Sequence, residues 1–395
     1  MKNSVKNIDS KGERGFTDIR SNNNDNLLLP SQGINEKILK ILNIAFEKCH
    51  NLKNNDKLIL IEILESYKKI VETGNYFNST FFLKNQEISE FLKLETKDVI
   101  RYILYRYKYN LYPDLKILEK YPPNIQVEIT SVCNLRCVMC FQADKTFSAK
   151  SKGHMGFMKF DLFKKIIDEV EGNLEAVTFA SRGEPTLHPE LDRFLKYCNN
   201  KFLGLKLNTN ATLLNEEKIH TLLSSDLQYL VLSIDEKNKK NYEKIRVNAD
   251  FDKIMKNLNL LKTIREKNYK NTKLKIRVSG VKINKQQDIN DMNNFYKEFS
   301  DEVALVNYVP WESTYDNPIN EIKETCSELY RRMFLWWDGK VNPCDYDYKS
   351  TLSKWNINNE TISSVWNSEY YNNIRTLHNE KKRKSLTPCN KCLST

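Results

Sequence analysis

Ile125-Gln-Val-Glu-Ile-Thr130, followed by Cys133-Asn-Leu-Arg-Cys137-Val-Met-Cys140, is the stretch of the chain that decides its fold. The first segment predicts a strand, and the three cysteines follow on a loop at its carboxyl end, where barrel folds place their chemistry. Three thiolates at this spacing can hold three irons of a 4Fe–4S cube and leave the fourth iron without a protein ligand. An open coordination position on a metal is the mark of a reactive site.

Strands and helices alternate after Tyr121-Pro122-Pro123, where two prolines end the preceding helix. Helices are expected between the strands, for example over Phe160–Val170 and Phe251–Lys267. This alternation predicts a parallel sheet wound by helices. The expected strands are Ile125–Thr130, Glu175–Ala180, Gly204–Asn208, Gln228–Ile234, Lys273–Val281 and Val303–Val309.

The first 120 residues have a different character. Residues 1–26 are polar and Asn-rich and predict a disordered tail. Residues 27–120 predict a helical region, because apolar residues recur there at helical spacing. Residues 87–100 predict two short helices joined by a turn, and a tyrosine-rich segment follows from Tyr102 to Tyr112.

The composition, with 40% hydrophobic and 11% aromatic residues in a chain of 395, is that of a globular protein. The chain has no run of eighteen apolar residues, so we expect no membrane-spanning helix. The N-terminus lacks the apolar core of a signal peptide. We therefore expect a cytoplasmic protein without a membrane partner. Nine cysteines in such a protein favour metal or redox chemistry over disulfides.

The net charge of +11 favours a lysine-rich solvated surface. The alternative is attraction to an acidic partner. Such a partner would be a phosphorylated substrate, a nucleic acid, or a flavodoxin or ferredoxin that supplies electrons. We expect the reductant and a small-molecule or peptide substrate as partners, and no nucleic acid.

The strand followed by C-x3-C-x2-C resembles the radical S-adenosylmethionine (SAM) enzymes. The resemblance implies a partial (β/α)6 TIM-like barrel in which SAM binds the open iron. Reduction of the cluster then cleaves SAM to a 5′-deoxyadenosyl radical that takes a substrate hydrogen. Met139 stands where many members carry an aromatic residue near the SAM adenine, and a thioether can also lie against a ring. A zinc knuckle or a disulfide cluster is the alternative for the same cysteines.

Further segments at the strand ends support this resemblance. Ser181-Arg-Gly-Glu-Pro185 resembles the G-G-E-P motif that binds the SAM ammonium group, with Arg182 in place of the first glycine. Leu207–Ala211 and Leu232–Asp235 resemble segments that line the SAM ribose and carboxylate, and Arg246 resembles an arginine that meets the carboxylate. Helix capping or surface pairing is the alternative for each residue. The implied SAM-binding residues, besides Met139, are Arg182, Gly183, Glu184, Pro185, Thr209, Asn210, Ser233, Asp235 and Arg246.

A second cysteine set lies near the C-terminus. Cys326 is followed after twelve residues by Gly339 and after four more by Cys344, and Cys389-x2-Cys392 comes near the end. This pattern resembles the SPASM/twitch extension of radical SAM enzymes, in its shorter twitch form. It implies one auxiliary 4Fe–4S cluster held by four cysteines. A structural zinc site with four cysteine ligands stays open as the alternative.

Asp345, directly after Cys344, stands where sulfatase-maturing relatives carry an aspartate proposed as a base. It is a candidate to deprotonate the substrate, or else a carboxylate that hydrogen-bonds near the cluster. The resemblance implies a barrel over residues 121–318, an auxiliary domain over 319–395, and oxidation of a small hydroxylated substrate such as a sugar or aminocyclitol. The alternatives are a peptide- or protein-modifying maturase and a non-catalytic iron–sulfur or zinc docking protein.

Overall fold

The computed structural model of the chain describes residues 18–21, 30–49, 52–284 and 286–394. These residues divide into two compact units. One holds residues 30–117, and the other holds residues 18–21 and 118–394. The expected barrel and the expected auxiliary domain fall into the same unit, and the boundary between them at residues 318 and 319 stays a prediction.

The first unit is helical, as expected. Its helices are α1 (Gln32–Glu47), α2 (Asn54–Thr73), α3 (Asn85–Phe91) and α4 (Thr96–Leu115), with a short 3-10 turn over Tyr76–Asn78. The second of the two short helices predicted over residues 87–100 is instead the start of α4, which has 20 residues. The tyrosine-rich segment lies inside α4, and Tyr102 and Tyr107 are buried there. The turn between the two helices is present, and burial of these rings accounts for the continuation of the second helix past residue 100.

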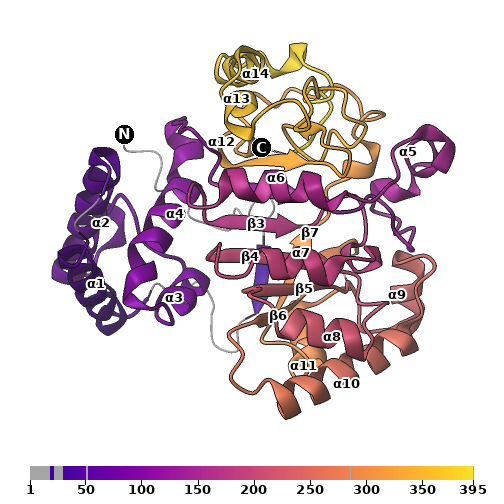
Figure 1. The fold of residues 1–395 in the computed structure, drawn as a ribbon, viewed down its shortest axis with the longest axis horizontal. Helices are drawn as coiled ribbons and strands as arrows, with labels where there is room; N and C mark the ends of the chain where they lie inside the picture. Colours follow the sequence, from indigo (N-terminus) through magenta and orange to yellow (C-terminus); the bar gives the residue numbers. More distant parts are fainter. Residues whose placement is uncertain (1–17, 22–29, 50–51, 285, 395) are drawn as a thin grey trace. The chain divides into compact units, whose positions relative to one another are not determined.

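The second unit is built on one nine-stranded sheet with the strand order β1-β7-β6-β5-β4-β3-β2-β8-β9. Figure 1 labels its strands β3 to β7. The pairs from β8 through β2 to β7 are parallel, and the two outermost pairs are antiparallel. All six predicted strands are present. The strands are β1 (Asp18–Ser21), β2 (Asn124–Val127), β3 (Ala176–Phe179), β4 (Gly204–Thr209), β5 (Tyr229–Ser233), β6 (Lys275–Lys282), β7 (Glu302–Asn307), β8 (Arg332–Leu335) and β9 (Val341–Asn342).

Helices connect these strands and cover one face of the sheet (Figure 1). The α/β fold with a partial-barrel strand order is therefore confirmed. The helices are α5 (Lys145–Ser148), α6 (Phe160–Val170), α7 (Leu191–Tyr197), α8 (Glu216–Leu223), α9 (Lys239–Ile245), α10 (Phe251–Asn268), α11 (Ile289–Tyr296), α12 (Glu328–Arg331), α13 (Ile362–Trp366) and α14 (Glu369–Asn379). Short 3-10 turns lie over Phe141–Ala143, Lys150–Lys152, Pro185–Leu187, Trp311–Ser313 and Arg383–Ser385.

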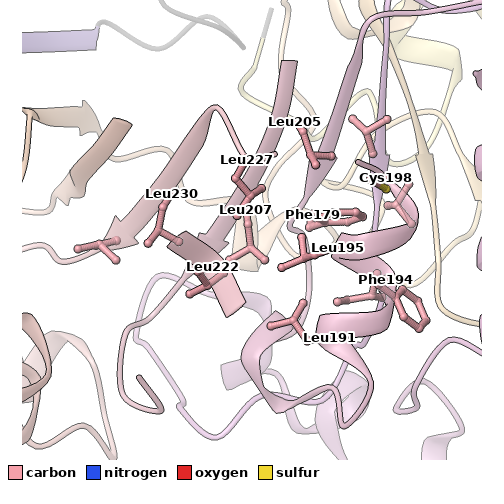
Figure 2. Packing of buried hydrophobic residues seen from close by; sticks show 14 of the residues in the cluster. Phe179, Leu191, Phe194, Leu195, Cys198, Leu205, Leu207, Leu222, Leu227 and Leu230 are labelled. Atoms are coloured by element: carbon pink, nitrogen blue, oxygen red, sulfur yellow. The ribbon is translucent and has the colours of Figure 1, made fainter. Parts of the chain in front are cut away.

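The core lies between the sheet and these helices. Figure 2 shows Phe194 and Leu195 of α7 packed with Leu205 and Leu207 of β4. Cys198 lies in the same cluster and is fully buried, so it packs there as an apolar side chain. Burying one such leucine side chain contributes about 1.5–3 kcal/mol, so this layer is a large share of the unit's stability.

The opposite face of the sheet is polar. Successive residues of a strand point to opposite faces, so Lys206 and Asn208 of β4 face away from the helices that Leu205 and Leu207 contact. Arg277 of β6 alternates in the same way with Ile276 and Val278. This inner face can therefore bind polar groups.

Two segments depart from the sequence-based expectation. Asp18–Ser21 lies inside the predicted disordered tail but forms β1, which pairs antiparallel with β7. The open edge of β7 offers unpaired backbone groups, which an extended segment of any composition can satisfy. Residues 1–17 and 22–26 of that tail lie outside the described residues. Near the C-terminus, β8 adds a parallel strand beside β2, so the cysteine-rich segment continues the sheet. No helix among the described residues is long and apolar enough to cross a membrane.

Candidate functional site

The loop of Cys133, Cys137 and Cys140 is attached to the end of α9. The amide of Arg136 donates to the carbonyl of Val247 at 3.0 Å, and the amide of Val138 donates to that of Ile245 at 2.9 Å. These two bonds flank Cys137 and place it opposite Arg246. The loop is therefore held by a segment more than a hundred residues further along the chain.

The three thiols of this loop lie close enough to affect each other electrostatically. Burial, then the charge of Glu184, raises the pKa of Cys133 to about 12. Burial and the neighbouring Cys137 raise the pKa of Cys140 as well. A thiolate there needs a positive partner, which iron supplies on binding. Buried, gathered thiols without a disulfide suit an iron–sulfur cluster.

A single metal ion needs a different arrangement of cysteines from that of an iron–sulfur cluster. Among the residues that the structure describes, no three His, Cys, Asp or Glu side chains are arranged to hold one metal ion. A single zinc needs every sulfur within about 2.3 Å of the same point. Each thiolate of a 4Fe–4S cluster instead binds a different iron.

Glu184 joins the predicted strand-end segments. Its Oε1 accepts hydrogen bonds from the hydroxyls of Thr186 and Thr209, both at 2.6 Å, and its Oε2 accepts from the amide of Asn210 at 2.6 Å. The amide side chain of Asn210 donates to Asn134 of the cysteine loop at 3.0 Å. The ends of β3 and β4 and the cysteine loop thus form one network, in which Thr209 and Asn210 orient the carboxylate of Glu184.

Gly183 is needed for a close approach. A Cβ atom there would lie 2.1 Å from the carbonyl oxygen of Thr130. The next residue, Glu184, donates its amide to the carbonyl of Val132 at 2.9 Å. The absence of a side chain at Gly183 lets the loop after β3 lie against the segment that leads to Cys133.

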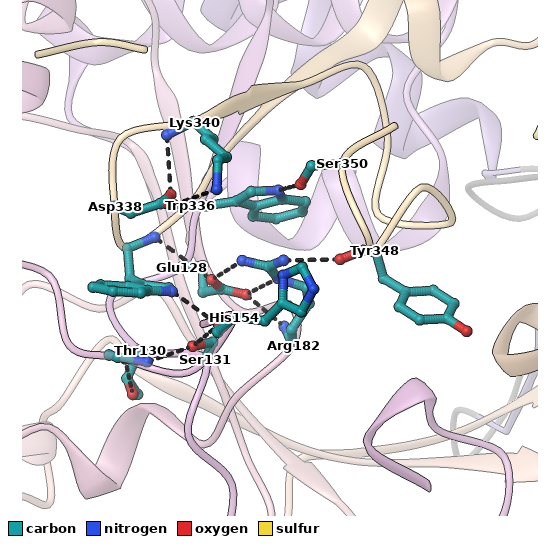
Figure 3. Close-up of polar contacts among 12 residues, drawn as sticks. Glu128, Thr130, Ser131, His154, Arg182, Trp336, Asp338, Lys340, Tyr348 and Ser350 are labelled. Carbon is teal, nitrogen blue, oxygen red and sulfur yellow. Dashed lines mark hydrogen bonds and ion pairs between the residues drawn. The ribbon is translucent and has the colours of Figure 1, made fainter. Parts of the chain in front are cut away.

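The side chain of Arg182 binds protein groups at Glu128 and Tyr348 (Figure 3). Its Nε and Nη2 donate to the two carboxylate oxygens of Glu128, each at 2.6 Å, and its Nη1 donates to the carbonyl of Tyr348 at 2.8 Å. The guanidinium also lies over the Trp336 ring at 4.1 Å. Any contact of Arg182 with SAM would therefore come from its backbone.

Asp235 and Arg246 form a buried ion pair. Nε of Arg246 donates to Oδ2 of Asp235 at 2.5 Å, and Nη2 donates to Oδ1 at 3.0 Å. Burial lowers the pKa of Arg246, but Asp235 and Cys137 raise it further, so the group stays charged. Its Nη1 lies 3.8 Å from Sγ of Cys137.

The remaining predicted SAM contacts lie along the same edge of the sheet. Met139 is buried beside Cys137, Ile245 and Val281. Pro185 is buried in the turn after Glu184, and Ser233 is half-buried as the last residue of β5. The assignment of Met139, Pro185 and Ser233 to SAM binding stays a prediction.

Several buried polar atoms at this edge fit a polar ligand. Within the described part of the chain, Ser181 Oγ, Gln142 Oε1, Asn208 Oδ1 and Tyr242 OH have no hydrogen-bond partner. Ser181 precedes the loop of Gly183, and Gln142 follows Cys140 by two residues. Buried polar atoms of this kind are costly unless something pairs with them, and the amino, carboxylate and ribose groups of SAM could do so.

The second cysteine set is assembled from three distant segments. Cys344 lies within electrostatic range of Cys326, Cys389 and Cys392, and burial, then these thiols, raises its pKa. Arg383 donates from Nε to the carbonyl of Cys389 at 2.9 Å and from Nη2 to that of Cys392 at 2.7 Å. Four gathered thiols can ligate one complete 4Fe–4S cluster.

Asp345 lies beside this set and against the polar face of the sheet. Its Oδ2 accepts from the side-chain amide of Gln126 on β2 at 3.4 Å, and only 8% of the residue is exposed. Nearby Asp347 instead accepts four bonds from Tyr315, Thr351 and Leu352, which marks it as structural. Gln126 and Glu128 were not predicted as site residues, because their only signal was a polar residue at alternate positions of the predicted strand Ile125–Thr130.

The two cysteine sets each have a member in an apolar cluster that Val306 and Trp311 contact. These two side chains pack against the cluster that includes Cys137 and Met139, and also against the cluster of Tyr346 and Cys392. The rings of Trp311 and Tyr346 meet edge to face at 6.2 Å. The described structure therefore places both clusters beside the same two side chains.

Comparison with protein families agrees with this geometry. Residues 127–293 match the model described as the radical SAM superfamily, and residues 326–393 match that of an iron–sulfur cluster-binding domain, SPASM. The first matched range contains Cys133, Cys137 and Cys140, and the second contains Cys326, Cys344, Cys389 and Cys392.

Individual relatives are distant. The chain is 26% identical over 318 residues, covering 67% of this chain and 86% of the relative, to a tungsten-containing aldehyde ferredoxin oxidoreductase cofactor-modifying protein of Pyrococcus furiosus. It is 23% identical to a GTP 3′,8-cyclase of Clostridium botulinum, over 66% of this chain and 94% of that one.

Solved structures are also similar at low identity. The crystal structure of BtrN in complex with AdoMet and 2-DOIA covers 70% of this chain and 94% of its own, at 17% identity and a TM-score of 0.47. That of Streptococcus suis SuiB bound to precursor peptide SuiA covers 83% and 84%, at 18% identity and a TM-score of 0.49.

Proposed function

The chain is a radical SAM enzyme with a C-terminal iron–sulfur SPASM domain, and from this premise we propose that it oxidises a small hydroxylated substrate, such as a sugar or aminocyclitol. Cys133, Cys137 and Cys140 would hold the SAM-binding cluster, and Cys326, Cys344, Cys389 and Cys392 the auxiliary cluster. Bound there, SAM would supply the radical chemistry that removes a substrate hydrogen atom, and the auxiliary cluster would supply an acceptor for the remaining electron.

The observation that carries the proposal is the position of Asp345. A net oxidation of an alcohol needs a group that takes the hydroxyl proton, and this carboxylate lies beside Cys344 and the polar face of the sheet. Gln126 orients Oδ2 of Asp345 by donating to it. The carboxylate of Asp345 would then accept the substrate proton. The half-buried Asn208, near the end of β4, suits a hydroxyl group of such a substrate.

Residues at the ends of β3 and β4 would bind SAM and keep its binding loop in place. Glu184 would bind the SAM ammonium group, with Thr209 and Asn210 fixing its carboxylate. Gly183 would keep this loop against the cysteine loop. A flavodoxin or ferredoxin as the reductant, and a cytoplasmic location, stay predictions.

The test is anaerobic reconstitution followed by turnover. We expect about eight irons per chain under the two-cluster assignment and 5′-deoxyadenosine formation with dithionite. A substrate deuterated at its carbinol carbon should pass deuterium to 5′-deoxyadenosine and yield one ketone per 5′-deoxyadenosine. Asp345→Asn should keep the deuterium transfer and lose about 10²–10⁴-fold in ketone formation. The exposed Asp192→Asn is the charge control and should leave both unchanged.

A peptide- or protein-modifying maturase is the second candidate. The helical unit of residues 30–117 lies outside both family matches, so it is available for a further role such as docking a peptide. Incubating the full enzyme with short peptides encoded beside its gene, followed by mass spectrometry, separates the two candidates. A peptide that loses two hydrogens, with no ketone formed from any sugar or aminocyclitol, would favour the maturase.

A further inference from the structure

Arg246 faces Cys137 because of the backbone register between their two segments. The bonds from Arg136 to Val247 and from Val138 to Ile245 form an antiparallel arrangement in which residues 137 and 246 are opposite each other. α9 ends at Ile245, so Arg246 is the first residue beyond the helix. The arginine is 8% exposed, and Cys137 is 7% exposed. Their contact is therefore built by the backbone and shielded from water.

The guanidinium of Arg246 is divided between two partners. One edge, Nε and Nη2, donates to the carboxylate of Asp235, and the remaining Nη1 points to Sγ of Cys137 at 3.8 Å. Asp235 is itself fixed, because Oδ1 also accepts from the amide of Val281 at 2.8 Å. A bidentate pair orients a guanidinium more tightly than a single bond does. Asp235 therefore sets the direction of Nη1.

The neighbouring Gly280 shows how closely this support is packed. A Cβ atom at Gly280 would lie 2.6 Å from the carbonyl oxygen of Ile234 and 2.7 Å from Cα of Asp235. The segment after β5 can thus lie directly against β6, and this contact keeps Asp235 beside the amide of Val281.

The donor on Cys137 differs from those on the other two cysteines. Sγ of Cys133 accepts from the amide of Leu135 at 3.4 Å, and Sγ of Cys140 accepts from the amide of Gln142 at 3.5 Å. Those donors are neutral backbone groups, whereas Arg246 carries a full positive charge. Hydrogen bonds to the sulfurs and local charge set the reduction potential of an iron–sulfur cluster.

We propose that Arg246, positioned by Asp235, raises the reduction potential of the SAM-binding cluster through its hydrogen bond to Cys137. Reduction adds negative charge to the cluster, and a cation beside a ligand sulfur stabilises the reduced form more than the oxidised form. The inference rests on the proposed assignment of Cys133, Cys137 and Cys140 to that cluster. It gives Arg246 a role toward the cluster itself, in place of the SAM-carboxylate contact expected from the sequence.

The first test is a redox titration of the reconstituted full chain without SAM, followed by EPR. The signal of the SAM-binding cluster is identified as the one that changes when SAM is added afterwards. We expect a more negative midpoint potential in Arg246→Gln, and a smaller shift in Arg246→Lys, which keeps the charge but cannot serve Asp235 and Cys137 together. Lys244→Gln removes an exposed charge from α9, just before Arg246, and should leave the potential unchanged.

The second test measures the wild-type protein directly. Protein grown with arginine labelled with ¹⁵N only in the guanidinium should show a ¹⁵N coupling to the reduced cluster in pulsed EPR. Backbone amides remain ¹⁴N and do not contribute. Arg246→Lys, grown in the same way, should lose the coupling and serves as the assignment control.

The outcomes separate this proposal from the proposed function, since neither test uses a substrate. Two results would overturn the proposed role of Arg246. One is an unchanged midpoint potential in both Arg246 variants, and the other is a spectrum of the labelled wild-type protein without a ¹⁵N coupling. Weaker SAM binding in Arg246→Gln with an unchanged SAM-free potential would also overturn it, in favour of the carboxylate contact. If Arg246→Gln loses iron, the ¹⁵N coupling of the wild type decides alone.

Discussion

The two cysteine sets are built in opposite ways. Cys133, Cys137 and Cys140 lie on one loop within eight residues, directly after one predicted strand. Cys326, Cys344 and the Cys389–Cys392 pair come from three segments that meet only when the chain folds. Each set has a buried arginine, but Arg246 donates to a cysteine sulfur whereas Arg383 donates to cysteine carbonyls. We infer that the first set is tuned for chemistry and that the second depends on its scaffold.

Removing one cysteine from each set should give the largest difference between the two sets. Cys137→Ala is expected to abolish 5′-deoxyadenosine formation and to leave about four of about eight irons. Cys389→Ala should also leave about four irons but retain 5′-deoxyadenosine formation, because its set lies outside the SAM site. Iron analysis and chromatography of the nucleoside measure both. Loss of SAM cleavage in Cys389→Ala, with the first cluster intact, would contradict the division.

Gly183→Ala tests how far the first set depends on its neighbouring loop. The added methyl group would meet the Thr130 carbonyl and displace the loop that carries Glu184. A misplacement of about 1 Å costs about 10²-fold in rate, so we expect a loss of that order in SAM cleavage with iron content unchanged. Gly33→Ala is the control, because a Cβ atom at Gly33 meets nothing within 4 Å. Wild-type turnover in Gly183→Ala would show that the close approach is dispensable.

Arg383→Met tests the scaffold of the second set. Its guanidinium is 1% exposed and satisfies the carbonyls of Cys389 and Cys392. Losing charged hydrogen bonds to buried acceptors should cost about 2–4 kcal/mol, seen as a lower Tm and a weaker hold on the auxiliary iron. The first cluster should keep its potential. A shift of that potential, equal to the shift in Arg246→Gln, would remove the contrast between the two arginines.

His188 provides the smallest effect, away from both sets. Burial lowers the pKa of His188 below its ordinary 6.5, and its Nε2 meets the carbonyl of Met158 at 3.0 Å. Since the unfolded chain binds a proton more readily, this residue should reduce stability as the pH falls below about 6.5. His188→Gln should flatten the dependence of Tm on pH in that range. A Tm that depends on pH equally in His188→Gln and in the wild type would contradict this contribution.

Much of the fold could be predicted from local patterns. The six expected strands and the helix over Phe160–Val170 are present, because apolar periodicity and proline positions act over short distances. β1 and β8 could not be predicted in this way. Both are short, and their place in the sheet depends on free edges of β7 and β2. An edge is a property of the assembled sheet and leaves no pattern in the added strand.

The candidate site also has features that local sequence predicts and features that depend on the folded chain. The sequence alone determined which chemistry the chain can perform, since cysteine spacing, the G-E-P loop and the C-terminal cysteines are short-range patterns of reactive groups. Tertiary structure decided which partner each buried charged group takes. Arg182 pairs with Glu128, and Arg246 divides itself between Asp235 and Cys137. A buried charge must be paired at close range, and only the folded chain shows which opposite charge lies within reach.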